Sequence, residues 1–157
     1  MTEQLSPLQW PPAWANPGMV DRLFIDLPVI GLKRRVHRAI SSQLLARSDS
    51  CFALWPSYLR TAHVLFTVAK SIQRWFRWPN SFYIPRDPCE ILFFSYDRSL
   101  DRARCILEIA ESLGVPIDAF ERLPEMCFGD LIESVAADLE TTHEEGEARN
   151  VTGKESR

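Results

Sequence analysis

The stretch from Tyr96 to Gly114 constrains the fold most, because it carries the signals of one complete helix. Apolar side chains recur along it at helical spacing and would form a single buried stripe. Asp97 or Ser99 can cap the free amide groups at its start, and Gly114 suits the left-handed conformation that ends a helix. We therefore predict a helix that ends at Leu113 and has a serine hydroxyl at its N-terminal end. The predicted stripe comprises Leu100, Ala103, Ile106, Leu107, Ala110 and Leu113.

The rest of the chain also favours helices over strands. It has only six glycines against eleven prolines and few alternating apolar runs, which argues against a sheet. Further helices are predicted from Val29 to about Arg47, from Tyr58 to Phe76 and from Phe128 to Leu139. The segment from Glu90 to Phe94 has strand propensity, but it lacks an obvious pairing partner, so we prefer a buried loop or a helical turn. The predicted fold class is all-α.

Three features indicate a cytoplasmic protein. No segment approaches eighteen uninterrupted apolar residues, so no transmembrane segment is expected. The first residues lack a basic head followed by an apolar run, so no secretory signal is expected. The four cysteines lack CxxC spacing, which indicates buried, reduced thiols rather than a metal site or disulfides. These cysteines are Cys51, Cys89, Cys105 and Cys127.

The motifs of common enzyme classes do not occur in the sequence. It contains no Gly-rich phosphate loop, no GxSxG elbow and no HExxH pair. The three histidines are scattered: His37 is expected at the surface among cations, His63 at the core or boundary of a helix, and His143 in a polar tail. We therefore predict a protein without catalytic residues, metal ligands or enzymatic activity.

Charge is distributed unevenly along the chain. Residues 33–86 contain ten basic residues and one acidic residue, whereas residues 87–157 contain 17 acidic and seven basic residues. The two halves could complement each other within the fold or between subunits. Alternatively, the basic half could bind phosphates, lipid head groups or an acidic partner.

The basic residues Arg34, Arg35 and Arg38 crowd the polar side of the amphipathic helix that is predicted after Val29. Such a helix is often simply solvated on a core, but it can also lie in a partner groove or make peripheral contact with an anionic membrane. These three arginines are therefore candidate partner-binding residues. No nucleic-acid-binding motif accompanies them, so no nucleic acid is expected.

The chain divides into an arm, a helical extension, a helical domain and a tail. Trp10 and Trp14 in the Pro-rich arm either pack back on the domain or dock into a partner groove. The tail is polar and lacks aromatic residues, which is typical of disorder. The predicted regions are an extended Pro/Trp arm (1–20), a basic helical extension (21–57), a helical domain (58–139) and a disordered tail (140–157).

A family resemblance rests on the spacing of four short motifs. Ser99-Leu100-Asp101 opens the predicted central helix, and Gly114 follows the serine after fifteen residues. Ile117-Asp118 lies in the next loop, and Gly129-Asp130-Leu131-Ile132 starts the last helix. In this order, the stretch from about Leu65 to Leu139 resembles the acyl carrier protein family. The resemblance implies a small four-helix bundle, here with an N-terminal helical extension.

The resemblance also implies a function. Ser99 would carry 4′-phosphopantetheine, whose thiol holds an acyl group, and its phosphate would lie near the partly positive end of a helix. Asp101 and Arg102 would then be candidates for contact with a partner protein. The chain departs from the family at Phe94-Ser95-Tyr96, which replaces an Asp-Leu-Gly lead-in, and at Arg98, which replaces an acidic residue.

Two functions remain open at this point. The first is a non-catalytic acyl-carrier-like protein modified on Ser99. The second is a cofactor-free helical adaptor that binds a protein through the basic helix and the aromatic arm, with Ser99 serving only as a helix cap.

Overall fold

The computed structural model describes residues 5–23, 25, 31–55, 62–96 and 100–152, with side chains described up to residue 141. This part of the chain is all-α, as predicted, and its only β-type pairing is an isolated antiparallel bridge between Pro88 and Cys127. The α-helices are α1 (Pro12–Ala15), α2 (Met19–Leu23), α3 (Leu32–Leu45), α4 (Ala62–Phe76), α5 (Cys89–Leu92), α6 (Asp101–Leu113) and α7 (Phe128–Thr152). Short 3-10 helices are η1 (Asp49–Leu54), η2 (Ile117–Phe120) and η3 (Leu123–Glu125).

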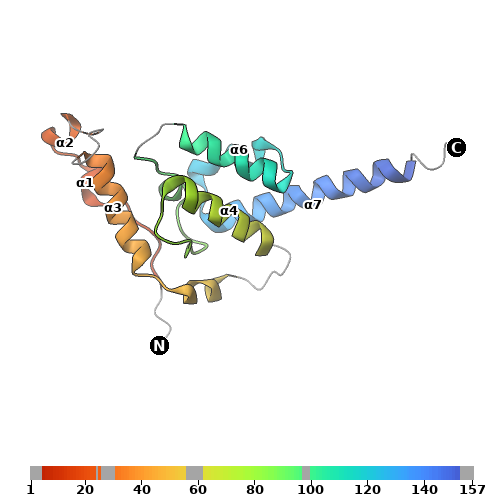
Figure 1. The fold of residues 1–157 in the computed structure, drawn as a ribbon, viewed down its shortest axis with the longest axis horizontal. Helices are drawn as coiled ribbons and strands as arrows, with labels where there is room; N and C mark the ends of the chain where they lie inside the picture. The colour runs from red at the N-terminus through yellow and green to blue at the C-terminus, as the bar shows by residue number, and fades with distance from the viewer. Residues whose placement is uncertain (1–4, 24, 26–30, 56–61, 97–99, 153–157) are drawn as a thin grey trace.

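The centre of the molecule is formed by α4, α6 and the first half of α7 (Figure 1). Helix α4 packs along α6 and also contacts α7, and η2 bridges α6 and α7. Helix α3 lies to one side, and its buried face joins the same apolar core. Residues of the predicted extension (21–57) and of the predicted domain (58–139) therefore share one core.

Helix α4 ends where the sequence predicts, at Phe76. Its apolar residues Val64, Val68 and Ile72 repeat every four positions and are buried against the core. The amide of Trp78 donates to the carbonyl of Gln73 at 3.1 Å, as in a Schellman ending. Arg77 therefore takes a left-handed conformation, with φ of 55°, at a position where glycine is usual.

The prediction for the buried stripe of α6 is confirmed for Ala110 and Leu113, which are buried, and for Ile106, which packs against the core, but it was wrong for the other three residues. Leu100 and Leu107 are 59% and 44% exposed, and Ala103 is exposed too. The buried row is instead Asp101, Cys105 and Ile109, continued by Ala110 and Leu113. Apolar residues occupy two adjacent faces of this helix, so their spacing alone cannot select the face that meets α4. Gly114 ends the helix with φ of 69°, as predicted.

The start of α6 also differs from the prediction. The helix begins at Asp101, the N-cap position is Leu100, and no side chain caps it. The predicted caps Asp97 and Ser99 lie outside the described residues.

Two parts of the chain expected to lack helices contain them. The arm contains α1, because a proline at the first position favours a helical turn, and its last two residues begin α2. Its indoles Trp10 and Trp14 stack on each other at 5.5 Å, and each meets the ring of Phe94 edge-on at 5.3 Å. The arm therefore packs back on the domain and is not an extended docking peptide.

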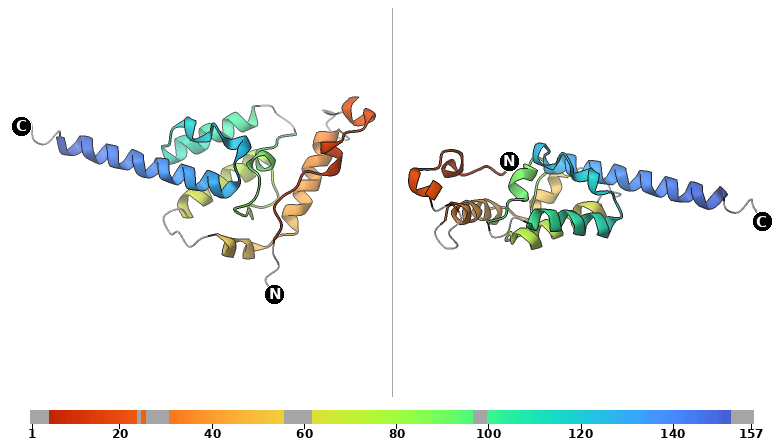
Figure 2. Two further views of the ribbon diagram at one scale, coloured as in Figure 1. Left: turned by 180° about the vertical axis from the view of Figure 1, so that it is seen from behind. Right: turned by 90° about the horizontal axis from the view of Figure 1, so that it is seen from above.

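The polar tail is helical as far as the described part extends. Helix α7 continues to Thr152 and projects away from the other helices (Figure 2). The expectation of disorder after residue 140 was wrong because Glu, Ala and Arg, all strong helix formers, recur in this segment and extend a helix that has already been nucleated in the core. Residues 153–157 lie outside the described part.

The segment from Glu90 to Phe94 is a helical turn, α5, rather than a strand, as preferred from the sequence. It is joined to the start of α7 by backbone bonds: the amide of Cys89 donates to the Met126 carbonyl at 3.0 Å, and the amide of Gly129 donates to the Pro85 carbonyl at 2.8 Å. A Cβ at Gly129 would lie 3.0 Å from Pro85 Cβ, so a larger residue would require Pro85 to shift by a few tenths of an ångström.

Candidate functional site at the start of α6

Two residues that flank Ser99 in the sequence, Ser95 and Asp101, share a partly buried hydrogen bond. Ser95 Oγ donates to Asp101 Oδ2 at 2.8 Å, which ties the residue before Tyr96 to the first turn of α6. Asp101 is buried, so its carboxylate is turned to the interior and is not available for the partner contact that we predicted. Ser99 itself lies outside the described residues.

Tyr96, three residues before Ser99, is contacted by cations from two helices. The Arg34 guanidinium of α3 lies 5.1 Å from the centre of the Tyr96 ring, within cation–π range. From the end of α4, Arg77 Nη1 donates to the Tyr96 hydroxyl at 3.3 Å. The ring of His37 meets Tyr96 edge-on at 4.5 Å. Tyr96 is therefore held by aromatic and hydrogen-bond contacts in a basic environment.

The prediction that His37 lies at the surface was wrong. Its ring is buried, stacks on Trp78 at 4.3 Å and lies with Nε2 2.8 Å from the Phe76 carbonyl. Burial lowers the pKa of His37, and the positive charges of Arg34 and Arg77 lower it further. The hydrogen bond to the Phe76 carbonyl acts in the opposite direction and raises the pKa, but by less than burial lowers it. His37 lies next to Val36 and Ile40 on the buried face of α3. We predicted it at the surface because the residues beside it in the sequence are charged. In contrast, His63 is exposed and does not take the predicted core or boundary position.

The structure places the other predicted partner-binding residues in different settings. Arg38 is exposed on the side of α3 opposite its buried face. Arg35 is exposed and pairs with Asp21 of α2. Arg102 is half-buried, and its Nε is buried without a hydrogen-bond partner. The five candidates therefore lie in different settings, and Arg35 and Arg38 are the exposed ones among them.

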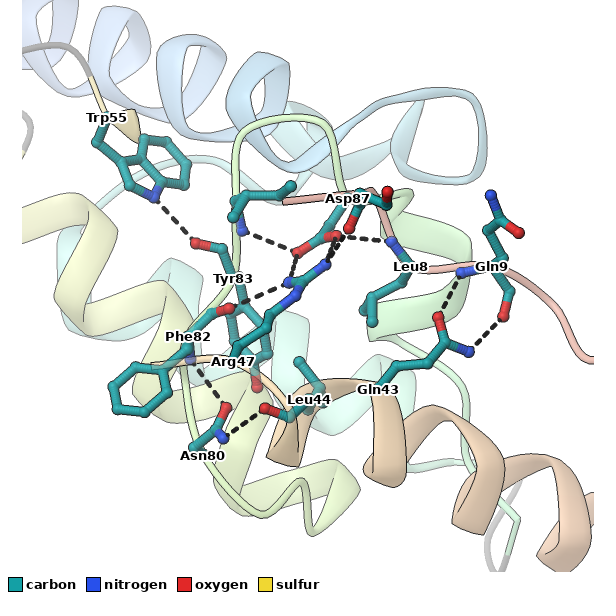
Figure 3. Close-up of polar contacts among 12 residues, drawn as sticks. Leu8, Gln9, Gln43, Leu44, Arg47, Trp55, Asn80, Phe82, Tyr83 and Asp87 are labelled. Carbon is teal, nitrogen blue, oxygen red and sulfur yellow. Dashed lines mark hydrogen bonds and ion pairs between the residues drawn. The ribbon is translucent and has the colours of Figure 1, made fainter. Parts of the chain in front are cut away.

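The strongest polar cluster of the described structure joins Arg47 to Asp87 (Figure 3). The Arg47 guanidinium donates twice to the Asp87 carboxylate, at 2.6 and 2.8 Å. Asp87 is fully buried, and it also accepts from the amides of Leu8 at 2.9 Å and Ile84 at 2.8 Å. Every group that approaches this carboxylate is a donor, which satisfies its buried charge.

Arg47 completes the cluster with two further bonds. It donates to the Phe82 carbonyl at 3.1 Å and to the Ser6 carbonyl at 2.9 Å. Beside the cluster, Asn80 Nδ2 donates to the Leu44 carbonyl at 2.9 Å (Figure 3). These contacts connect the N-terminal segment, the end of α3 and the loop before α5, so the cluster has a structural role.

Sequence reasoning missed this cluster. Arg47 and Asp87 are forty positions apart, and neither belongs to a motif that indicates pairing. The prolines on both sides of Arg86-Asp87 indicate a restricted loop, but they do not identify a partner for Asp87.

The cysteines are not activated as nucleophiles. All four are free thiols; three are buried, as predicted, and Cys127 is half-buried. Burial raises the pKa of Cys51 and Cys105, and it raises the pKa of Cys89 to about 12. The pKa of Cys127 is also raised, first by burial and then by its hydrogen bond to Asp130. Within the described part of the chain, no three His, Cys, Asp or Glu residues are grouped as metal ligands.

Comparison with known proteins finds no matching family model, no matching curated protein and no matching solved structure. Among the helices that the structure describes, none combines the length and apolar character needed to cross a bilayer.

Proposed function

We propose that the chain is a non-catalytic, acyl-carrier-like protein in which Ser99 carries 4′-phosphopantetheine. The observation that supports this proposal most is the arrangement around the Ser99 segment. Ser95 and Asp101, which flank this segment in the sequence, are hydrogen-bonded to each other, and the residue that follows the serine, Leu100, is exposed. The all-α fold, in which α4 contacts α6 and α7, also supports the proposal.

The residues near this segment fit a phosphodiester. The N-terminal end of α6 follows Ser99 directly in the chain and favours negative charge. Arg34 and Arg77 both contact Tyr96, and their positive charges would attract a phosphate group in the neighbouring segment. When bound, the group would supply a thiol for attachment of an acyl chain. The protein's own residues would hold the phosphate and position the arm.

The test is the intact mass of the full chain after incubation with coenzyme A and a broad-specificity phosphopantetheinyl transferase. We expect the mass to increase by one phosphopantetheinyl group, located on Ser99 by peptide mapping. Ser99→Ala should abolish the increase, and Ser95→Ala should retain the attachment site. An unmodified mass with several transferases, under conditions that modify a known carrier, refutes the proposal.

A second function, a cofactor-free adaptor, is favoured by a different observation. Helix α6 exposes Leu100 and Leu107 on the side away from the core, next to the exposed Arg104. Exposed apolar side chains rimmed by charge are typical of protein-binding surfaces.

The adaptor hypothesis predicts a distinct pattern in a pull-down experiment from native cells. Leu100→Ser with Leu107→Ser should abolish capture of the partner, and charge reversal of Arg34 and Arg38 tests the contribution of the basic helix. Ser99→Ala should leave capture unchanged. Loss of capture in Ser99→Ala alone contradicts the adaptor and agrees with the carrier.

A further inference from the structure

The exposed surface of α2 is apolar and lies at one end of the molecule. Met19, Val20 and Leu23 are 81%, 67% and 73% exposed. Helix α2 lies at the end of the molecule opposite the C-terminal end of α7, in all views (Figures 1 and 2). Large apolar side chains that cluster at a protruding end, rather than lie singly on the surface, indicate a binding surface.

The geometry of α2 directs this surface away from the protein. Each residue advances a helix by roughly 100°, so Met19, Val20 and Leu23 lie within one arc of roughly 100°. Asp21 lies on the opposite side, where it pairs with Arg35 of α3. This ion pair attaches α2 to α3, and the amide of Lys33 donates to the Ile25 carbonyl at 3.2 Å close by. The apolar face of α2 therefore points to solvent, and the contacts with α3 fix the position of the helix.

The same end of the molecule is positively charged. Residues 5–45 contain five basic residues and two acidic ones, although the whole chain has a net charge of −3. Arg22 lies on α2 itself, beside the apolar arc, and is exposed. Arg35 and Arg38 are exposed on α3. The surface thus combines apolar side chains that can insert with cations that can bind negatively charged groups.

We propose that α2 and the exposed side of α3 dock the protein on an anionic lipid bilayer. Met19, Val20 and Leu23 insert at the level of the head groups, while Arg22 and Arg38 contact anionic head groups. Apolar insertion and a few cations each give weak binding, and together they give stable but reversible attachment. An acidic protein partner would be served by the cations alone and would not need an aliphatic face at a protruding end. This inference is independent of any modification of Ser99.

The test measures binding of the full chain to vesicles by flotation. One set of vesicles contains phosphatidylcholine alone, and the other contains phosphatidylcholine mixed with phosphatidylglycerol. We expect binding only to the anionic vesicles, and we expect it to weaken strongly between about 0.1 M and about 1 M salt, where the screening length falls from about 10 to about 3 Å. Equal binding to both sets, or binding to neither, overturns the proposal.

Matched variants separate the two contributions. Met19→Ser with Leu23→Ser should weaken binding by at least about tenfold, because two inserted side chains lose their apolar contact. Arg22→Glu with Arg38→Glu should weaken it by at least about 30-fold, since each cation near an anionic surface contributes roughly a fivefold to tenfold factor.

The controls carry the same substitutions on other exposed residues. These are Leu107→Ser with Ile117→Ser, and Arg104→Glu with Arg122→Glu, and both pairs should bind as the wild-type protein does. Equal losses in the controls overturn the assignment of the surface to α2. Gel filtration is run on each protein: if the α2 variant changes a self-associated wild-type chain into a smaller species, the surface is a subunit interface and the membrane proposal fails.

Discussion

Replacing Asp87 by asparagine tests whether the buried ion pair with Arg47 stabilises the contact between the end of α3 and the loop before α5. The substitution preserves the shape of the side chain but removes its charge. It leaves the Arg47 guanidinium buried, with its side chain only 4% exposed, and turns an amide donor toward other donors. The perturbation is therefore electrostatic rather than a change in packing volume.

The size of the effect follows from the bonds that are lost. Two charge-assisted hydrogen bonds, at about 1.5–3 kcal/mol each, join Arg47 to Asp87. Arg47 keeps the carbonyls of Ser6 and Phe82, which partly satisfy its charge in the variant. We therefore expect Asp87→Asn to lower the free energy of unfolding by about 3–4 kcal/mol, within the range for a broken buried pair. This corresponds to a decrease in Tm of about 10 °C for a chain of this size.

The assay is urea unfolding followed by tryptophan fluorescence and by circular dichroism. Asp21→Asn, which breaks the more exposed pair with Arg35, is the control and should cost less than about 1 kcal/mol. Adding Arg47→Met to Asp87→Asn should cost about 2 kcal/mol less than the sum of the two single changes, because the unpaired cation is removed. A cost for Asp87→Asn equal to that of the control, or strict additivity, refutes this reasoning.

Three further predictions concern single side chains. Tyr83→Phe should raise the free energy of unfolding by about 1 kcal/mol, because the buried Tyr83 hydroxyl has no hydrogen-bond partner; a lower midpoint in urea would contradict this. Arg77→Gly should be about 1 kcal/mol more stable than Arg77→Ala, since only glycine adopts φ of 55° without cost, and an equal midpoint would show that the backbone there is unstrained. Because burial holds the pKa of His37 below its ordinary value of 6.5, the unfolded chain binds a proton first as the pH falls below about 6.5, and stability should decrease in that range. His37→Gln should flatten this part of the profile of unfolding free energy against pH, and an unchanged slope would show that other groups cause it.

The sequence predicted helices better than it predicted which of their faces are buried. The end of α4 at Phe76 could be predicted because Pro79 disfavours helix in the residue before it, and the end of α6 because glycine readily takes the left-handed conformation. The register of α6 could not, since Leu107 and Ile109 belong to two apolar faces and only the position of α4 selects between them. His37 shows the same limit, because neighbouring charges say little about the side of a helix on which a residue lies.

The candidate site was predicted less completely than the fold. The sequence singled out Ser99 and the start of α6, and the resemblance supplied the chemistry. The resemblance made Asp101 a candidate for partner contact, but its side chain is buried and accepts a hydrogen bond from Ser95. Contacts between distant parts of the chain, such as those of Arg34 and Arg77 with Tyr96, leave no local signal in the sequence.

The bond between the Leu8 amide and the Asp87 carboxylate has a consequence for biosynthesis. The two residues are 79 positions apart, and the carboxylate that accepts the bond is also paired with Arg47. A chain that emerges from the ribosome N-terminus first, at about 5–20 residues per second, makes α3 several seconds before Asp87 is available. During this interval the apolar face of α3 has no core to cover it. The nascent chain is therefore most exposed to aggregation or chaperone binding before the loop that precedes α5 has left the ribosome.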